Sequence, residues 1–171
     1  MFDKQLHLFF DYLTYEKKYS THTVTSYKND IAQFIGFINP HNEDISSEEI
    51  NYQQIRAWVS ELIKHKIAAR SINRKLSALK SFFKFLQRQQ TIEVNPMSKI
   101  SGPKTPKRLP SFVDEHQMED LFTEVKFDEG FVGQRDKLIL DLLYQTGIRR
   151  SELTHLKELD VDLFNSTIKV L

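Results

Sequence analysis

Residues 69–87 carry basic and hydroxyl side chains at helical spacing, with no acidic residue among them. At about 100° per residue, the apolar and polar residues of this segment fall on opposite sides of a helix. The apolar side consists of Ile72, Leu76, Leu79, Phe83 and Leu86, and the polar side and its flank consist of Arg70, Asn73, Arg74, Ser77, Lys80, Ser81, Lys84 and Arg88.

This set of side chains has the chemistry of a DNA-binding surface. Arginine and lysine neutralise phosphates, while serine and asparagine hydrogen-bond phosphate oxygens or base edges. Because a helix fits the major groove of a duplex, we expect this segment to contact DNA. The alternative is a solvated polar face, but such faces usually mix both signs of charge.

A second anion-binding position is expected at Ser20–Thr23. Hydroxyls and backbone N–H groups at the start of a helix favour a bound anion, and Thr23 is the candidate contact. Lys28, one turn further on, adds a positive charge. Simple N-capping is the alternative explanation for these hydroxyls.

The charge of the chain is unevenly distributed. The net charge is +1, but residues 1–110 hold 17 Lys/Arg against 10 Asp/Glu, and residues 111–171 hold 7 against 13. Between residues 62 and 110, 12 basic residues accompany a single acid, Glu93. A basic stretch within a balanced chain predicts a polyanionic partner, nucleic acid first.

Several other chemistries are excluded by what the sequence lacks. There is no Cys, so thiol nucleophiles and cysteine zinc sites are excluded. The six histidines have no metal-binding spacing, and the five glycines form no phosphate-binding loop. No apolar run approaches the ~20 residues of a membrane span, and the N-terminus does not resemble a signal peptide. We therefore expect a cytoplasmic protein with no metal, cofactor or membrane partner.

Helical periodicity dominates the elements that must position these residues. Apolar stripes predict four amphipathic helices within residues 1–88, the second ended by Asn39–Pro40 and the third begun by Asn51 with Gln54 as a capping pair. Residues 94–111 hold four prolines, so we expect a linker without a regular element. Its basic residues Lys99, Lys104, Lys107 and Arg108 could follow a phosphate backbone.

After the linker, Asp114 and Gln117 predict the start of a short helix. A helix over residues 131–145 is expected to bury Leu138, Ile139, Leu142 and Leu143 and to end at Thr146–Gly147. Residues 151–157 predict another short helix, and residues 167–171 a strand without a partner, as if the chain were cut short.

Four blocks of sequence resemble the tyrosine recombinases of the Xer and integrase type. Ser20 to Phe37 resembles a family pattern that contains Ser20, Thr23, Tyr27, Asp30 and Phe34. The segments that resemble the other three blocks are residues 74–83, the linker with Asn95–Pro96 and Arg108–Leu109–Pro110, and residues 135–153 with Thr146–Gly147–Ile148–Arg149. The resemblance covers essentially the whole chain in the family's order.

The resemblance implies a mainly α chain: a four-helix SAM-like core-binding domain (1–88), a proline-rich basic linker (89–110) and the helical beginning of a mixed α/β catalytic domain that ends in a first strand (111–171). In relatives the second and fourth helices cross the major groove, which agrees with the polar face that the helical pattern independently predicts for the fourth. The implied DNA contacts are Thr23, Lys28, Arg70, Asn73, Arg74, Ser77, Lys80, Ser81 and Lys84.

The resemblance also implies the chemistry of the second part. In the family, a tyrosine attacks the scissile phosphate and forms a 3′-phosphotyrosyl bond, with no metal or ATP. Arg149 matches the first catalytic arginine, which binds the phosphate oxygens as charge develops on them. Glu152 matches the acid that holds this arginine in place. None of the six tyrosines matches the nucleophile, so we expect these 171 residues to bind DNA without cleaving it.

Three functional hypotheses follow from the sequence. The first is a Xer-like recombinase for chromosome dimer resolution, acting at cell division and chromosome partition as a homo- or hetero-tetramer with related recombinases on paired double-stranded sites. The second is a phage or transposon integrase of the same family, whose role is DNA integration. The third, from another class, is a non-catalytic helical interaction module whose basic face binds an acidic protein.

Overall fold

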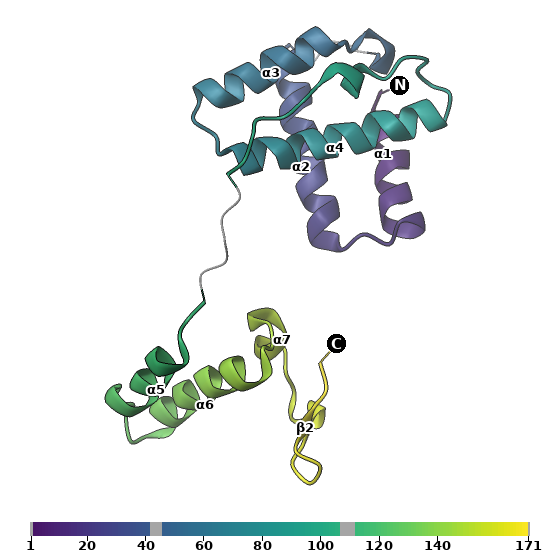
Figure 1. The fold of residues 1–171 in the computed structure, drawn as a ribbon. Helices are drawn as coiled ribbons and strands as arrows, with labels where there is room; N and C mark the ends of the chain where they lie inside the picture. The colour runs from purple at the N-terminus through teal and green to yellow at the C-terminus, as the bar shows by residue number, and fades with distance from the viewer. Residues whose placement is uncertain (1, 42–45, 107–111, 171) are drawn as a thin grey trace. The chain divides into compact units, whose positions relative to one another are not determined.

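The computed structural model describes residues 2–41, 46–106 and 112–170, which form two units, residues 1–108 and 109–171 (Figure 1). In both, helices make up most of the regular structure, which confirms the mainly α expectation. Among the described residues, no helix is long and apolar enough to cross a membrane.

The first unit is built from α1 (Phe2–Asp11), α2 (Thr21–Ile38), α3 (Tyr52–Lys64) and α4 (Ala69–Arg88). α1 continues into a π-helical turn, Tyr12–Glu16. Local caps set the helix starts: the Ser20 hydroxyl accepts the Thr23 N–H at the start of α2. At the start of α3, the Asn51 side chain accepts the Gln54 N–H while Gln54 Oε1 accepts the Asn51 N–H. The four helices and the Asn51–Gln54 capping pair are as predicted.

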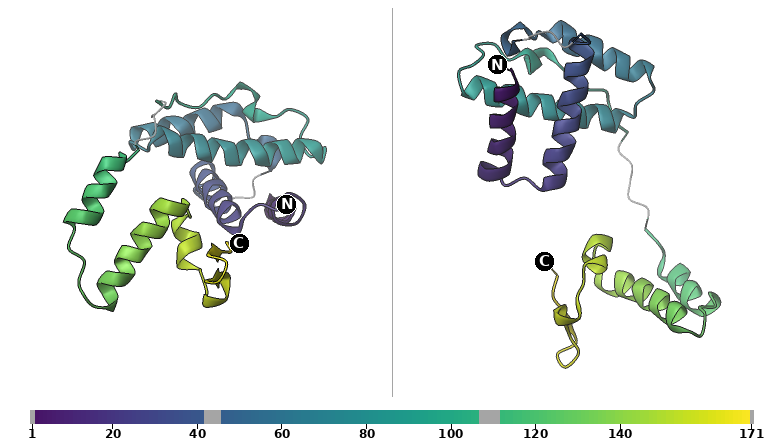
Figure 2. Two further views of the ribbon diagram at one scale, coloured as in Figure 1. Left: turned by 60° about the horizontal axis from the view of Figure 1, so that its bottom comes forward. Right: turned by 180° about the vertical axis from the view of Figure 1, so that it is seen from behind.

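The core of the first unit lies where α1 and α2, which run beside each other, cross α3 and α4 (Figures 1 and 2). Aromatic rings fill this crossing. The Phe34 and Trp58 rings lie 5.2 Å apart between centroids, and those of Phe9 and Phe82 lie 5.3 Å apart. The predicted apolar side of α4 is buried throughout, so the opposite side of that helix faces solvent.

A buried carboxylate joins α2 to α4. Asp30 on α2 is 1% exposed and accepts hydrogen bonds from two cations on α4. Lys75 Nζ donates to Asp30 Oδ1 over 3.0 Å, and Arg74 Nη1 donates to Asp30 Oδ2. Lys75, itself buried, also donates to Gln33 Oε1 over 2.5 Å. Because an unpaired buried charge is costly, arrangements of α2 and α4 that separate Asp30 from these two cations are disfavoured.

The expectation that residues 94–111 contain no regular element is wrong at Pro96–Lys99, which form a 3₁₀ turn. The Asn95 side chain caps the turn by accepting the Met97 N–H over 2.9 Å, and Pro96 and Met97 are buried against α3 and α4. Apolar burial therefore folds this part of the proline-rich stretch onto the first unit. Lys107, Arg108 and Leu109–Pro110 lie outside the described residues.

The second unit contains α5 (Glu115–Glu124), α6 (Phe131–Thr146), α7 (Arg150–Thr154) and a hairpin of β1 (Val161–Asp162) and β2 (Thr167–Ile168). Asp114 caps α5 with Gln117 as predicted, and Gly147 ends α6 at φ +64°. The strand predicted at the end of the chain is not unpaired. Val161 pairs with Ile168, and Asp162 with Thr167, in an antiparallel register.

The expectation that α6 buries its apolar stripe is wrong, because none of the four predicted residues is fully buried. Leu138 and Ile139 are 57% and 36% exposed, and Leu142 and Leu143 are only half-buried. Within residues 112–114 and 116–170, the one buried residue is Gly133, where α6 approaches the Asp128 backbone so closely that a Cβ would clash. The described part of this unit therefore places no second apolar layer over that side of α6.

We predict that Asp30→Ala destabilises the first unit by about 3–5 kcal/mol, because it leaves Lys75 buried without its counter-charge. Urea unfolding followed by the fluorescence of Trp58, the single tryptophan, measures this unit selectively. Asp11→Ala is the control: Asp11 is exposed and makes no capping hydrogen bond, so the change should stay within about 0.5 kcal/mol. Equal losses in the two variants would contradict the buried triad.

Candidate nucleic-acid interface

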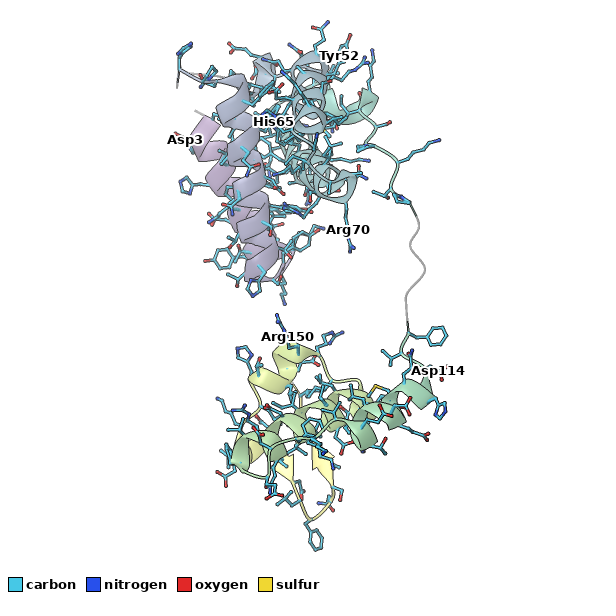
Figure 3. All side chains as sticks on the ribbon, turned by 90° about the vertical axis from the view of Figure 1, so that its left-hand side faces the viewer. Asp3, Tyr52, His65, Arg70, Asp114 and Arg150 are labelled. Carbon is cyan, nitrogen blue, oxygen red and sulfur yellow. The ribbon has the colours of Figure 1, made fainter. Side chains whose placement is uncertain are left out.

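The structure places most of the predicted DNA contacts on the solvent-facing side of α4. Arg70, Arg74, Ser77, Lys80 and Lys84 are exposed. Figure 3 shows Arg70 projecting away from the end of the helix. α4 has 20 residues and none of them is acidic, so this face is positively charged over its full length. A face of this kind attracts phosphates, and among the described residues only one of these five side chains, Arg74, is paired with a carboxylate, that of Asp30 on α2.

Ser77 and Asn73 lie in different surroundings although they are neighbours on the helix. Ser77 is exposed and its hydroxyl donates to the Asn73 carbonyl over 2.9 Å. Asn73 is half-buried, and its Nδ2 donates to the Pro103 carbonyl over 2.9 Å. The backbone at Gly102 approaches Asn73 so closely that a Cβ there would clash with the amide. Asn73 therefore anchors the segment that follows the 3₁₀ turn.

The two predicted residues of α2 also differ in their local contacts. Thr23 is half-buried, and its hydroxyl lies 2.9 Å from the Ser20 hydroxyl within the cap. Lys28 is exposed, with its Nζ 5.2 Å from the centre of the Phe10 ring. A cation over an aromatic face is weakly attracted and stays available to solvent. Lys28 thus adds an exposed positive charge on α2, the helix that is joined to α4 through Asp30.

A basic groove lies between the π-helical turn and the C-terminal half of α4. Its volume is about 650 Å³, and its polar lining consists of Tyr12, Lys17, Tyr19, Ser81, Lys84, Gln87 and Arg88. No acidic side chain is among the described residues that line it. This arrangement extends the positive surface of α4 past Ser81 and Lys84.

Two cations of this groove, Lys17 and Arg88, lie close to the Tyr12 ring. Lys17 Nζ and the Arg88 guanidinium lie 5.7 Å and 5.8 Å from the Tyr12 ring centre, and Arg88 Nη1 donates to the Tyr12 hydroxyl over 3.4 Å. Tyr12 and Lys17 are not among the residues that the sequence singles out, whereas Arg88 falls on the predicted polar side of the helix. Tyr12 and Arg88 are 76 positions apart, so the fold rather than a local motif brings them together.

The second unit positions an arginine with a carboxylate. Arg149 is the residue before α7, and both oxygens of Glu152 accept hydrogen bonds from it: Oε2 from the backbone N–H over 2.8 Å and Oε1 from Nη1 over 2.6 Å. The Arg149 side chain is 81% exposed and that of Glu152 only 18%. Glu152 thus holds Arg149 while the rest of its guanidinium faces solvent.

The same contacts set the acidity of Glu152. Hydrogen bonds from the Arg149 backbone N–H and guanidinium lower the pKa of the Glu152 carboxyl below its ordinary value. Glu152 also lines a pocket of about 260 Å³ with Ser151, His155, Asp160 and Lys169. Lys169 has no role in the sequence-based expectations. It lies in this pocket because the β1–β2 hairpin folds back toward α7.

Comparison with known families assigns both parts of the chain to one family. Residues 6–90 match the N-terminal SAM-like domain of phage integrases, and residues 111–171 match the phage integrase family. The chain is 44% identical over 165 residues to the tyrosine recombinase XerC of Bacillus pumilus and 41% identical over 166 residues to that of Bacillus licheniformis. These alignments cover 96% of this chain and 53% and 54% of the relatives. The chain thus spans about half the length of the curated relatives it matches.

A solved structure of similar fold is that of the Tn1549 transposon integrase in complex with a circular intermediate DNA. The TM-score is 0.63 at 16% sequence identity, over 92% of this chain and 49% of that one. At this identity the similarity concerns the fold. This similarity of fold agrees with the two family matches, a SAM-like helical domain followed by the start of an integrase catalytic domain.

We predict that Arg149→Ala raises the pKa of Glu152, because the carboxylate loses its guanidinium partner. In the unaltered chain, the Arg149–Glu152 contacts are complete above the ordinary glutamate pKa of about 4.3 and are lost as the pH falls through the lower folded value. Side-chain carboxyl NMR over a pH titration measures the shift. Arg150→Ala is the matched control, because the hydrogen bonds that Glu152 accepts come from Arg149. An equal rise of the Glu152 pKa in that variant would contradict the pairing.

Proposed function

Because the chain belongs to the phage integrase family of tyrosine recombinases, we propose that its activity is Xer-type site-specific DNA recombination and that α2 and α4 bind a duplex half-site. The proposed contacts are Thr23, Lys28, Arg70, Arg74, Ser77, Lys80, Ser81 and Lys84. Asn73 supports this surface by holding the segment at Pro103. The partner is a double-stranded recombination site.

The observation that carries the proposal is the acid-free polar face of α4. Its opposite side is the core of the unit, so the helix cannot rotate and the basic face must stay in solvent. Arginine and lysine give affinity through phosphate contacts, and Ser77 and Arg74 are of the types that hydrogen-bond base edges. A helix of this length fits the major groove.

In the second unit, Arg149 is the proposed transition-state residue. In-line attack on a phosphodiester builds negative charge on the non-bridging oxygens, and a fixed guanidinium stabilises that charge. Glu152 is a positioning residue that restricts Arg149 through two hydrogen bonds. The proposed chemistry uses a tyrosine nucleophile and needs no metal or cofactor.

Identities of 41–44% to two XerC recombinases favour a Xer role in chromosome dimer resolution over a mobile-element integrase. With that role we propose action in the cytoplasm at cell division and chromosome partition, as a homo- or hetero-tetramer of recombinases on paired sites. We also propose the division into a DNA-binding domain (1–88), a linker (89–110) whose Pro96–Lys99 turn packs on that domain, and the beginning of a catalytic domain (111–171).

Selection of binding sites by the 171-residue chain from a randomised duplex pool, at near-physiological salt, tests the proposed function. We expect a short motif to be enriched and the duplex to remain uncut. Lys84→Ala should weaken binding to all sequences alike and reduce the slope of log K against log salt by about 1, as the loss of one phosphate contact does.

Lys4→Ala is the matched control, because it removes an exposed cation from α1 rather than from the α2–α4 surface. Both the enriched motif and the salt slope should be unchanged in it. Weak binding without an enriched motif would contradict the proposal and favour an acidic protein partner for the basic face.

A further inference from the structure

The position of Arg74 differs from that of the other cations on α4. It lies where α4 crosses α2, and Asp30 holds it from inside the unit. Its side chain is nevertheless 47% exposed, whereas that of its neighbour Lys75 is only 8% exposed. Lys75 therefore compensates the charge of Asp30 within the core, and Arg74 reaches the surface.

The contact with Asp30 uses one end of the Arg74 guanidinium. Nη1 donates to Asp30 Oδ2, and among the described residues no acceptor is hydrogen-bonded to Nε or Nη2. These two groups form one of the two edges with which an arginine makes paired hydrogen bonds, and it is the edge that does not use Nη1. A guanidinium fixed at Nη1 presents that edge in one direction with little loss of rotamer freedom on binding.

This geometry fits the paired acceptors of a guanine, and the charge of Asp30 makes a phosphate contact at the same edge less favourable. The O6 and N7 atoms of guanine accept two parallel hydrogen bonds in the major groove, and such a contact depends on direction. Phosphate contacts depend mainly on net charge through the release of counterions. Asp30 offsets part of the charge of Arg74 but leaves its Nε–Nη2 edge intact. It therefore weakens a phosphate contact more than a guanine contact.

We propose that Arg74 reads a guanine in the major groove and that Asp30 is the positioning residue that holds its guanidinium for this contact. The inference rests on the proposed duplex binding and goes further, because it separates one base-reading arginine from the phosphate-binding cations of the same helix. Lys75 neutralises the remaining charge of Asp30 and has no direct contact with DNA.

The test uses the 171-residue chain and the motif enriched by that chain from the randomised duplex pool. Each G·C pair of the motif is replaced in turn by A·T, and the ratio of the two dissociation constants is measured for each variant. In the unaltered chain, one pair should show a preference of about ten- to a hundredfold. Arg74→Ala should abolish the preference at that pair and leave the salt slope nearly unchanged.

Asp30→Asn should reduce the preference at the same base pair, because the amide no longer fixes the guanidinium by charge. Loss of folded protein lowers both affinities equally, so the ratio reports positioning rather than stability. Lys75→Met is the matched control: it removes the other cation of the triad and should keep the preference. Thermal unfolding of each variant gives its folded fraction.

Three outcomes would overturn the account at different points. If Arg74→Ala weakens binding to every duplex alike and lowers the salt slope by about 1, Arg74 is a phosphate contact. If Asp30→Asn keeps the full preference, Asp30 only stabilises the fold. If the unaltered chain enriches no motif, duplex recognition itself fails and the base-reading role of Arg74 fails with it.

Discussion

The structure of the first unit depends on one buried carboxylate. Asp30 lies at the crossing of α2 and α4, where a negative charge is tolerated only because Lys75 and Arg74 donate to it. The contact joins the two helices at their crossing. Together with the aromatic core packed on the apolar side of α4, it keeps the basic side of that helix in solvent.

The second unit also contains an arginine whose position is restricted by a carboxylate. Glu152 fixes Arg149 through two hydrogen bonds, as Asp30 fixes Arg74, and in both pairs the arginine retains N–H groups that face solvent. A carboxylate restricts the direction of an arginine without removing its capacity to bind a further acceptor. In the proposed recombinase, one such arginine reads the site and the other stabilises charge on the scissile phosphate.

Sequence reasoning succeeded where structure is determined locally. The helix starts at Asn51 and Asp114 and the end at Gly147 depend on side chains or backbone within a few residues, so their patterns are visible in the chain. The basic face of α4 follows from helical periodicity, and comparison with known families confirmed the family resemblance. The roles of the individual site residues remain proposals.

What the sequence could not supply is contact between distant residues. Asp30 and Arg74 are 44 positions apart, and the groove around Tyr12 joins residues further apart still. The 3₁₀ turn at Pro96–Lys99 forms because it is buried against α3 and α4, which Pro96 by itself does not indicate. The β1–β2 hairpin has two residues in each strand, too few for an alternating pattern.

The central claim is that the surface of α2 and α4 is the part of this chain that binds duplex DNA. NMR of the 171-residue chain during titration with a short duplex tests it residue by residue. The account predicts that the largest shifts and line broadening fall on Lys28, Arg74, Ser77 and Lys84, with the guanidinium signals of Arg74 among them. Shifts confined to residues 112–170, or spread evenly over both units, would contradict it.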